Sequence, residues 1–580
     1  MALVVKEKWC IGNIFKTVMS ANAGIQNVLK VMDYGLSQND VSFVDSKDRP
    51  DNHISLHPFK AFSFTHDAHS CIFTFMMKDM IERIKQATVY DVAVVTPLEQ
   101  ASKLSRQLNN KVLLKREDLQ PVFSFKLRGA YNRMAALSPE DAKNGVVAAS
   151  AGNHAQGVAL SARQLGITAT IVMPKTTPAI KVDAVRHLGA EVILHGNTYD
   201  DACSYAYTLR DERQAVFIHP YDDPAVIAGQ ATIAVEILEQ HPEHIDTFFI
   251  PVGGGGLIAG MAAWIKHCRP ASKIVGVEPD DAGCFHAALQ AGKRVELEQV
   301  GIFADGVAVK QIGETTFELA RNLVDEVILV STDEICAAIM DIFDDTRTIT
   351  EPAGALAVAG MKKYARREEV LDQTLIAVNS GANMNFDRLR HVAERAEIGE
   401  QCEGLLAVTI PERPGSFRDF CDLFAEQGIT EFNYRYSDAA EAHVFVGVKL
   451  SRGVEEQEMM LAMFKKHGYD AIDMTDNEMA KIHTRYMVGG RASHAVDDEI
   501  LYRFEFPERP GALLRFLNHM ATGWNISLFH YRNHGAAYGR VLVGMQVPQE
   551  DMPQFQKFLD DVGYRYSCET DNPAYKLFLK

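Results

Sequence analysis

The stretch Ser124-Phe125-Lys126-Leu127-Arg128-Gly129-Ala130 sets the fold class of this chain, because of what lies on either side of it. A strand-like apolar run, Val112 to Leu114, ends shortly before it, and Ser124 is a candidate N-cap for a helix that contains the lysine. Three pieces follow downstream: Ser150-Ala151-Gly152-Asn153-His154, Gly253-Gly254-Gly255-Gly256-Leu257 and Ser380-Gly381-Ala382-Asn383. Each piece is a weak signal alone, and their order along the chain makes them one strong signal.

The chain length and charge bound the class of protein. A chain of 580 residues is long enough for roughly three to five domains. The net charge of −17 argues against a nucleic-acid partner and against an anionic membrane. The nine cysteines lack C-x-x-C spacing, so neither a disulfide framework nor a zinc cluster is indicated, and we expect a cytoplasmic protein.

Residues from about 80 to 400 alternate between strand and helix patterns. The runs 146–149, 168–173 and 190–194 are short and apolar, and helix-like segments separate them. This alternation predicts an α/β fold with a parallel sheet that is covered on both faces. Ligands of such sheets bind beyond the carboxyl ends of the strands, which is where the asparagine and glycine loops fall.

One stretch resembles a membrane span. Thr247 to Ile265 is nineteen residues without a charge, but it contains Pro251 and four consecutive glycines. We interpret it as a strand, a loop and a buried helix, and expect no membrane partner.

The last 180 residues contain a tandem duplication. Pro411-Glu412-Arg413-Pro414-Gly415 recurs 96 residues later from Pro507, and Tyr434-Arg435 recurs 97 residues later from Tyr531. Each copy is predicted to run strand, helix, strand, strand, helix, strand, which is the ferredoxin-like α+β arrangement. Neither copy has a clustered nucleophile and base, so we expect ligand sensing, with oligomerisation as the alternative.

Four regions follow from these patterns. Residues 1–78 are expected to be a mobile extension, or to precede a biological start at one of Met76, Met77 and Met80. Residues 79–400 form the predicted catalytic domain, and residues 401–495 and 496–580 form the two repeats.

The residue types in the first half suit pyridoxal phosphate. The Lys126 amine can form a Schiff base with an aldehyde and then act as a general base. Gly253 to Gly256 can close around a phosphate at a helix N-terminus. A dinucleotide fingerprint is excluded because Ile258 and Ala259 stand where its last glycine is needed, and no Walker lysine is present.

Two polar loops complete the candidate site. The segment Ser150, Ala151, Gly152 and His154 can hold a substrate carboxylate, and the Asn153 amide can bond the ring hydroxyl of the cofactor. Ser380 beside the ring nitrogen would leave the ring nearly uncharged, because a serine hydroxyl is too weak an acid to protonate it. A neutral ring favours prompt loss of a β-substituent over a long-lived carbanion.

With Glu351-Pro352-Ala353-Gly354-Ala355 added, these motifs resemble those of the biosynthetic threonine dehydratases, enzymes of the fold-type II (tryptophan synthase β-like) pyridoxal-phosphate class. The resemblance covers residues from about 80 to 580, both repeats included. It implies that Lys126 carries the cofactor. The residues implied to bind the cofactor are Phe125, Lys126, Asn153, Gly253, Gly254, Gly255, Gly256, Leu257 and Ser380.

The resemblance also implies an activity and its regulation. The reaction is the conversion of L-threonine to 2-oxobutanoate and ammonia, a step toward isoleucine, in a homotetramer. The repeats are similar to the ACT-like regulatory domain, in which isoleucine inhibits and valine opposes the inhibition. Tyr434 and Tyr531 are the expected effector-binding residues, because they occupy equivalent positions in the two repeats.

Other functions stay open at this point. A serine/threonine dehydratase or a racemase shares the same core, and a non-catalytic sensor that binds the cofactor is the alternative from another class. Some relatives bind a divalent metal after a Val-Glu-Pro segment, through a carboxylate six residues beyond the glutamate. Here Cys284 stands six residues after Glu278, so no required metal is expected at that site.

Overall fold

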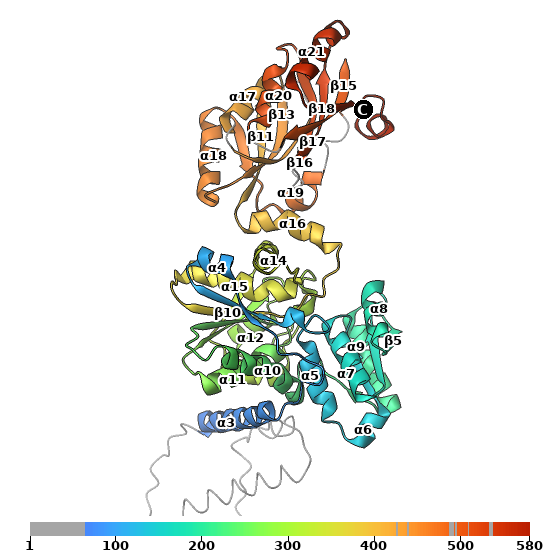
Figure 1. Cartoon of the computed structure of the whole chain (residues 1–580), viewed down its shortest axis with the longest axis vertical. Coiled ribbons are helices and arrows are strands. Elements are labelled where there is room, and N and C mark those ends of the chain that lie inside the picture. Colours follow the sequence, from blue (N-terminus) through green and yellow to red (C-terminus); the bar gives the residue numbers. More distant parts are fainter. Residues whose placement is uncertain are drawn as a thin grey trace, which may run out of the picture. The chain divides into compact units, whose positions relative to one another are not determined.

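The computed structural model describes residues 64–424, 427–437, 440–486, 492, 496–507, 510–532 and 538–580, with side chains from residue 73 onward (Figure 1). The prediction for residues 1–78 therefore falls largely outside the described residues. Within the described part, no helix is long and apolar enough to cross a membrane. The uncharged stretch at 247–265 is a strand, a glycine loop and the greater part of a buried helix, as expected.

A six-stranded sheet organises the large domain, in the order β1-β2-β10-β7-β8-β9. Every neighbouring pair is parallel except β1 and β2. The predicted parallel sheet is thus confirmed, with one antiparallel edge strand added. The strands are β1 (Leu98–Gln100), β2 (Lys111–Arg116), β7 (Thr247–Pro251), β8 (Lys273–Pro279), β9 (Glu326–Val330) and β10 (Thr374–Asn379).

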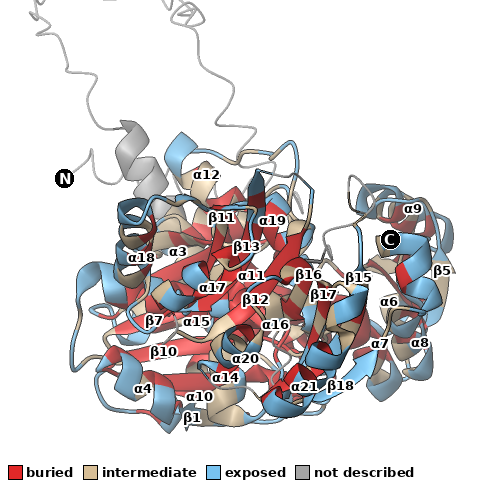
Figure 2. Cartoon of the chain, turned by 90° about the horizontal axis from the view of Figure 1, so that it is seen from above, coloured by how far each residue is buried: buried red, intermediate tan, exposed pale blue. Residues whose placement is uncertain are grey.

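Both faces of this sheet are buried, because successive apolar side chains point to opposite faces. Phe248 packs into one core cluster and its neighbour Phe249 into another. Figure 2 shows β7 and β10 coloured as buried. The first cluster includes residues of α3 (Phe64–Lys85), α10 (Pro224–Gln240), α11 (Gly256–Cys268), α12 (Cys284–Ala291) and α13 (Glu314–Ala320). The second includes residues of α4 (Ser102–Leu108), α14 (Thr332–Thr346), α15 (Pro352–Glu368) and α16 (Arg388–Gly399).

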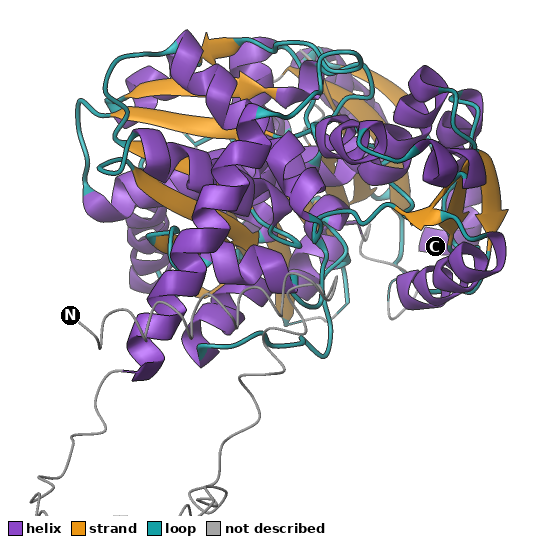
Figure 3. Ribbon diagram, turned by 90° about the horizontal axis from the view of Figure 1, so that it is seen from below, coloured by secondary structure: helices purple, strands orange, loops and turns teal. Residues whose placement is uncertain are grey.

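A smaller domain is inserted between β2 and β7, and its sheet is separate from the first. Four parallel strands lie in the order β5-β4-β3-β6, with helices packed on both faces. Figure 3 shows how the purple helices enclose the orange strands. The strands are β3 (Val146–Ala149), β4 (Ala169–Met173), β5 (Glu191–Leu194) and β6 (Val216–Phe217). The helices are α5 (Lys126–Ala135), α6 (Pro139–Asn144), α7 (Asn153–Leu165), α8 (Ala179–His187) and α9 (Tyr199–Arg213).

The C-terminal residues form one continuous sheet of eight strands, in the order β14-β11-β13-β12-β16-β17-β15-β18. Each repeat has the strand and helix order that the sequence predicts. The first repeat contains β11 (Glu403–Pro411), α17 (Ser416–Cys421), β12 (Ile429–Arg435), β13 (Glu441–Lys449), α18 (Val454–Lys466), β14 (Asp470–Asp473) and the following α19 (Glu478–Ile482). The second contains β15 (Glu499–Pro507), α20 (Ala512–His519), β16 (Asn525–Arg532), β17 (Tyr538–Gln546), α21 (Met552–Val562) and β18 (Arg565–Cys568).

The two repeats meet where β12 pairs with β16. In this antiparallel register Tyr434 lies opposite Phe529, and Phe432 lies opposite Tyr531. Because the pairing is reciprocal, Tyr434 and Tyr531 hold equivalent places in the two repeats.

Candidate functional site

Lys126 is the first residue of α5, and its side chain is half-buried. Its Nζ donates a hydrogen bond to the Pro220 carbonyl oxygen at 3.1 Å. Burial lowers the pKa of Lys126 to about 8, and the nearby Glu351 carboxyl acts in the opposite direction. This amine therefore gives up its proton more readily than a surface lysine does, as a base or nucleophile requires. The predicted Ser124 cap is wrong: Phe125 is the N-cap, and the Ser124 hydroxyl has no hydrogen-bond partner among the described residues.

A buried ionic network holds the helix that carries Lys126. Arg128 Nε lies 2.8 Å from Glu117 Oε2, and Arg128 Nη1 lies 2.6 Å from Glu236 Oε1. Lys115 Nζ lies 2.6 Å from Glu236 Oε2, so two cations and two carboxylates balance. Charges buried this deeply are tolerated only when they are paired, so the network ties α5 to the end of β2 and to α10.

The glycine loop connects β7 to α11 and leaves no room for side chains. A Cβ on Gly254 would lie 2.2 Å from the Tyr221 ring, and a Cβ on Gly253 would lie 2.9 Å from the Val307 Cα. Gly255 has φ +90°, in the left-handed region that favours glycine. The loop thus brings backbone N–H groups to the start of a thirteen-residue helix, an arrangement that binds anions.

The side chains of Asn153, Glu351 and Asn383 form a short chain of hydrogen bonds. Asn153 Nδ2 donates to Glu351 Oε1 at 2.6 Å, and Asn383 Nδ2 donates to Asn153 Oδ1 at 2.7 Å. Burial, and after it the negative charge of Asp305, raise the pKa of Glu351 to about 7. Ser380 is 4% exposed and lies directly after β10. Its hydroxyl donates to the Ala353 carbonyl oxygen at 3.3 Å.

One narrow cavity gathers the predicted cofactor residues. Its volume is about 30 Å³. All nine residues predicted to bind the cofactor line it, from Phe125 to Ser380. Six further lining residues were not predicted: Tyr221, Pro251, Gly306, Val307, Glu351 and Ala353. Of these, Glu351 and Ala353 belong to the motif Glu351-Pro352-Ala353-Gly354-Ala355, and their position beside the cavity was the missing information.

The predicted substrate segment lies beside this cavity without lining it. Ser150 Oγ accepts a hydrogen bond from the Gly152 N–H at 3.3 Å, just before α7 begins. The buried His154 Nε2 donates to the Ile218 carbonyl oxygen at 2.8 Å. Burial lowers the pKa of His154 to about 3, and the neighbouring Lys126 charge adds to this effect. His154 is therefore a neutral imidazole inside the small domain.

Glu278 is the glutamate of the segment at which no required metal is expected, and in the structure its carboxylate binds backbone N–H groups. Its two carboxylate oxygens each accept a backbone hydrogen bond at 2.8 Å, from the N–H groups of Phe285 and His286. The carboxylate thus satisfies the N-terminus of α12. Within the described residues, no group of three or more histidine, cysteine or acidic side chains could hold a metal ion.

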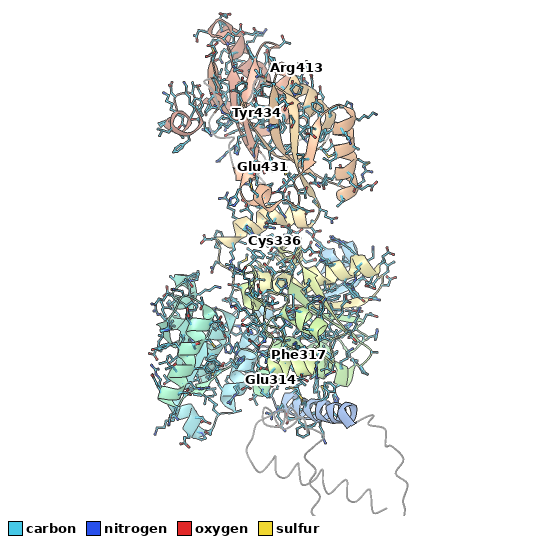
Figure 4. All side chains as sticks on the ribbon, turned by 180° about the vertical axis from the view of Figure 1, so that it is seen from behind. Glu314, Phe317, Cys336, Arg413, Glu431 and Tyr434 are labelled. Atoms are coloured by element: carbon cyan, nitrogen blue, oxygen red, sulfur yellow. The ribbon has the colours of Figure 1, made fainter. Side chains whose placement is uncertain are left out.

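A second and larger cavity, of about 510 Å³, lies between the two C-terminal repeats. Apolar side chains of both repeats line it, together with Lys449 and Glu456. Tyr531 lines this cavity, whereas Tyr434 does not. The Tyr434 hydroxyl instead donates to Glu412. Figure 4 labels Tyr434 in the C-terminal region. The two predicted effector residues therefore lie in different environments.

Comparison with known proteins agrees with this geometry. Residues 89–381 match the family of pyridoxal-phosphate dependent enzymes, and residues 394–484 and 490–579 match the C-terminal regulatory domain of threonine dehydratase. The chain is thus a pyridoxal-phosphate enzyme with a duplicated regulatory region.

The chain matches two curated relatives over almost the whole of their length. The biosynthetic L-threonine dehydratase of Burkholderia multivorans is 57% identical over 504 residues, which are 86% of this chain and 99% of the relative. That of Escherichia coli is 53% identical over 501 residues, 86% of this chain and 97% of the relative. The chain belongs to the biosynthetic threonine dehydratases, which are lyases. A solved structure of the processed threonine deaminase isoform 2 of Solanum lycopersicum is 49% identical, with a TM-score of 0.54, over 55% of this chain and 93% of that one.

The residues present fit the cofactor that the family uses, pyridoxal phosphate. A lysine of lowered pKa faces a glycine loop that any Cβ would obstruct, and an asparagine amide borders the same cavity. These are an amine for the aldehyde, a cradle for the phosphate and a donor for the ring hydroxyl.

Proposed function

We propose that this enzyme converts L-threonine to 2-oxobutanoate and ammonia, and that isoleucine inhibits it. The observation that carries the proposal is the single cavity in which the buried Lys126 amine, the glycine loop and Ser380 meet. The names of the relatives, which are biosynthetic L-threonine dehydratases, support threonine as the substrate.

Lys126 has two tasks in the proposed reaction. Its Nζ carries the cofactor before the substrate arrives, and once released it takes the proton from the substrate Cα. The bound cofactor supplies the electron sink for the pair left at Cα. The β-hydroxyl then leaves as water, and hydrolysis of the released product adds one water back, so that the net change is the loss of ammonia.

The other cavity residues bind and orient. Gly253 to Leu257 hold the cofactor phosphate through backbone N–H groups, and Asn153 donates to the ring hydroxyl. Ser380 is proposed to lie beside the ring nitrogen. Its hydroxyl is too weak an acid to protonate that nitrogen, which favours elimination. Ser150 to Gly152 receive the substrate carboxylate through backbone and hydroxyl groups at the start of α7.

A direct assay tests this reaction. The purified enzyme is given threonine and, separately, serine, and 2-oxo acid and ammonia are measured with time. We expect 2-oxobutanoate from threonine, with a higher kcat/KM for threonine than for serine. A preference for serine would favour the serine dehydratase alternative, and a cofactor spectrum that responds to threonine without product would favour a sensor.

The 510 Å³ cavity between the repeats is the proposed isoleucine site. Its charged residues, Lys449 and Glu456, suit the carboxylate and ammonium groups of an amino acid, and its apolar lining suits a branched side chain. Tyr531 borders this cavity, and Tyr434 occupies the equivalent place in the first repeat, where valine is proposed to oppose the inhibition.

Substitution of these tyrosines tests the effector sites. We expect Tyr531→Ala to raise the isoleucine concentration that gives half inhibition by about tenfold or more, because one well-placed contact in a small-ligand site is worth about that factor. Tyr434→Ala should change the response to valine. If both variants respond to isoleucine and valine as the parent does, the assignment is wrong.

The proposed assembly and location follow the family. We propose a homotetramer in the cytoplasm. The seven cysteines whose side chains the structure describes are all free, which agrees with a reducing compartment. Light scattering on the purified holoenzyme measures the assembly.

A further inference from the structure

Glu351 is a buried carboxyl group in the cofactor cavity that the proposed reaction does not use. It is 4% exposed and stands at the N-cap of α15, where its backbone N–H donates to the Gly381 carbonyl oxygen at 3.1 Å. A Cβ on Gly381 would lie 2.5 Å from Glu351 Oε1, and one on Gly306 would lie 3.7 Å from it. The missing side chain of Gly381 thus makes room for this carboxyl beside the cavity, whereas a Cβ on Gly306 would be in ordinary contact with it.

The Glu351 carboxyl fixes which way the Asn153 amide points. Asn153 Nδ2 donates to Glu351 Oε1 at 2.6 Å, while Asn153 Oδ1 accepts from Asn383 at 2.7 Å. Asn383 is itself anchored by a bond to the Val122 carbonyl oxygen at 2.8 Å. A carboxylate accepts and does not donate, so the amide nitrogen must face Glu351, and one N–H of Asn153 is left for a ligand.

We propose that Glu351 is a positioning residue of this enzyme, which holds the Asn153 amide so that its second N–H donates to the ring hydroxyl of the cofactor. The proposal rests on the proposed role of Asn153 as the partner of that hydroxyl. Glu351 acts through Asn153, and its effect is seen in cofactor binding, before any substrate is present.

The charge on Glu351 makes this function depend on pH. Burial, followed by the nearby Asp305, raises the pKa of Glu351 to about 7, while the Asn153 bond, Lys181 and the Asn383 backbone N–H lower it. Lys126 also faces this carboxyl. Above about pH 7 the carboxylate makes a charge-assisted bond to Asn153, and below it the neutral acid makes a bond roughly half as strong. Cofactor affinity therefore falls as pH drops through this range.

Three variants test the proposal by cofactor titration of the apoenzyme between pH 6 and 8, a window chosen to span about one unit on either side of that pKa. Glu351→Gln keeps the shape and the acceptor oxygen but cannot ionise. We expect its affinity to be several-fold weaker than the parent at the upper pH and to lack the step near neutrality. Glu351→Ala should bind about tenfold more weakly, because the amide loses its anchor.

Asp305→Asn is the matched variant, since it removes a neighbouring charge and leaves Glu351 in place. We expect its affinity step to move to lower pH, because the charge that raises the pKa of Glu351 is gone. This arm stays informative if Glu351→Gln does not fold. A Glu351→Gln enzyme with parental affinity at every pH, or an Asp305→Asn step that does not move, would overturn the proposal. Since no substrate is used, failure of the threonine reaction gives a separate result.

Discussion

Lys126 differs from a surface lysine because its side chain is partly withdrawn from water and its amine donates a hydrogen bond to a backbone carbonyl oxygen. Desolvation disfavours the ammonium form, so the lowered pKa follows from the place of the residue and not from a special sequence neighbour. The place is set by Arg128, two positions along the same helix. The lowered pKa of Lys126 thus depends on the ion pairs that Arg128 makes.

Replacement of Arg128 by methionine should destabilise the catalytic domain strongly. Glu117 and Glu236 would keep their buried carboxylates and lose a partner, at a cost of roughly 3–5 kcal/mol. Calorimetry of the apoenzyme measures the effect as a fall in the unfolding temperature. Arg210→Met is the control, because its pair with Asp211 is exposed and should matter by less than about 0.5 kcal/mol. Equal shifts in the two variants would refute the argument.

At the scale of single elements, the loop between β7 and α11 has no room for side chains. Tyr221 packs directly against Gly254, so the backbone of the loop is held between an aromatic ring and a helix start. The loop is therefore closely packed even though it consists of glycines.

Gly254→Ala should weaken cofactor binding by about tenfold or more, since the new methyl would lie 2.2 Å from the Tyr221 ring and push the loop or the ring away. The double variant Gly254→Ala, Tyr221→Ala should recover part of the loss, because the clash is removed. Gly523→Ala is the control, since nothing lies within 4 Å of its added Cβ. Cofactor titration measures these three variants and the single variant Tyr221→Ala. A double variant that binds no better than the sum of its single changes would contradict the clash.

The sequence was sufficient for the elements, and the nine residues it proposes for the cofactor line one cavity. The β7 strand, the glycine loop and α11 were predicted from apolar runs and glycines, which are local signals. Ser124 was misread as a cap because a serine before a helix is only a statistical signal, and the chain places Phe125 there. Tyr221 and Glu351 were not predicted as site residues, because their approach to the cavity depends on packing between segments far apart in the chain.

At the scale of the whole C-terminal region, two repeats share one sheet. The duplication was visible in the sequence, but the pairing of β12 with β16 was not, because no local pattern specifies which edges of two similar sheets join. Arg435 crosses this junction: it forms an ion pair with Glu499 of the second repeat, and its Nη2 donates to the Leu579 carbonyl oxygen at 2.7 Å. Both side chains of the ion pair are buried, so the pair ties the two repeats together.

Arg435→Met should loosen the junction and reduce inhibition by isoleucine, because Glu499 would lose its buried cation. We expect at least a severalfold rise in the isoleucine concentration for half inhibition, with kcat/KM for threonine in the absence of isoleucine unchanged. Arg503→Met is the control, since its pair with Glu569 is partly exposed, on the arginine side. Parental inhibition in Arg435→Met would show that the junction does not carry the response.

The identity of the amine that carries the cofactor is the central claim, and one measurement tests it directly. The holoenzyme is reduced with borohydride, digested, and its cofactor-labelled peptide is sequenced by mass spectrometry. The account predicts one labelled lysine, Lys126, in the peptide that contains Ser124 to Gly129. A label on any other lysine would contradict it.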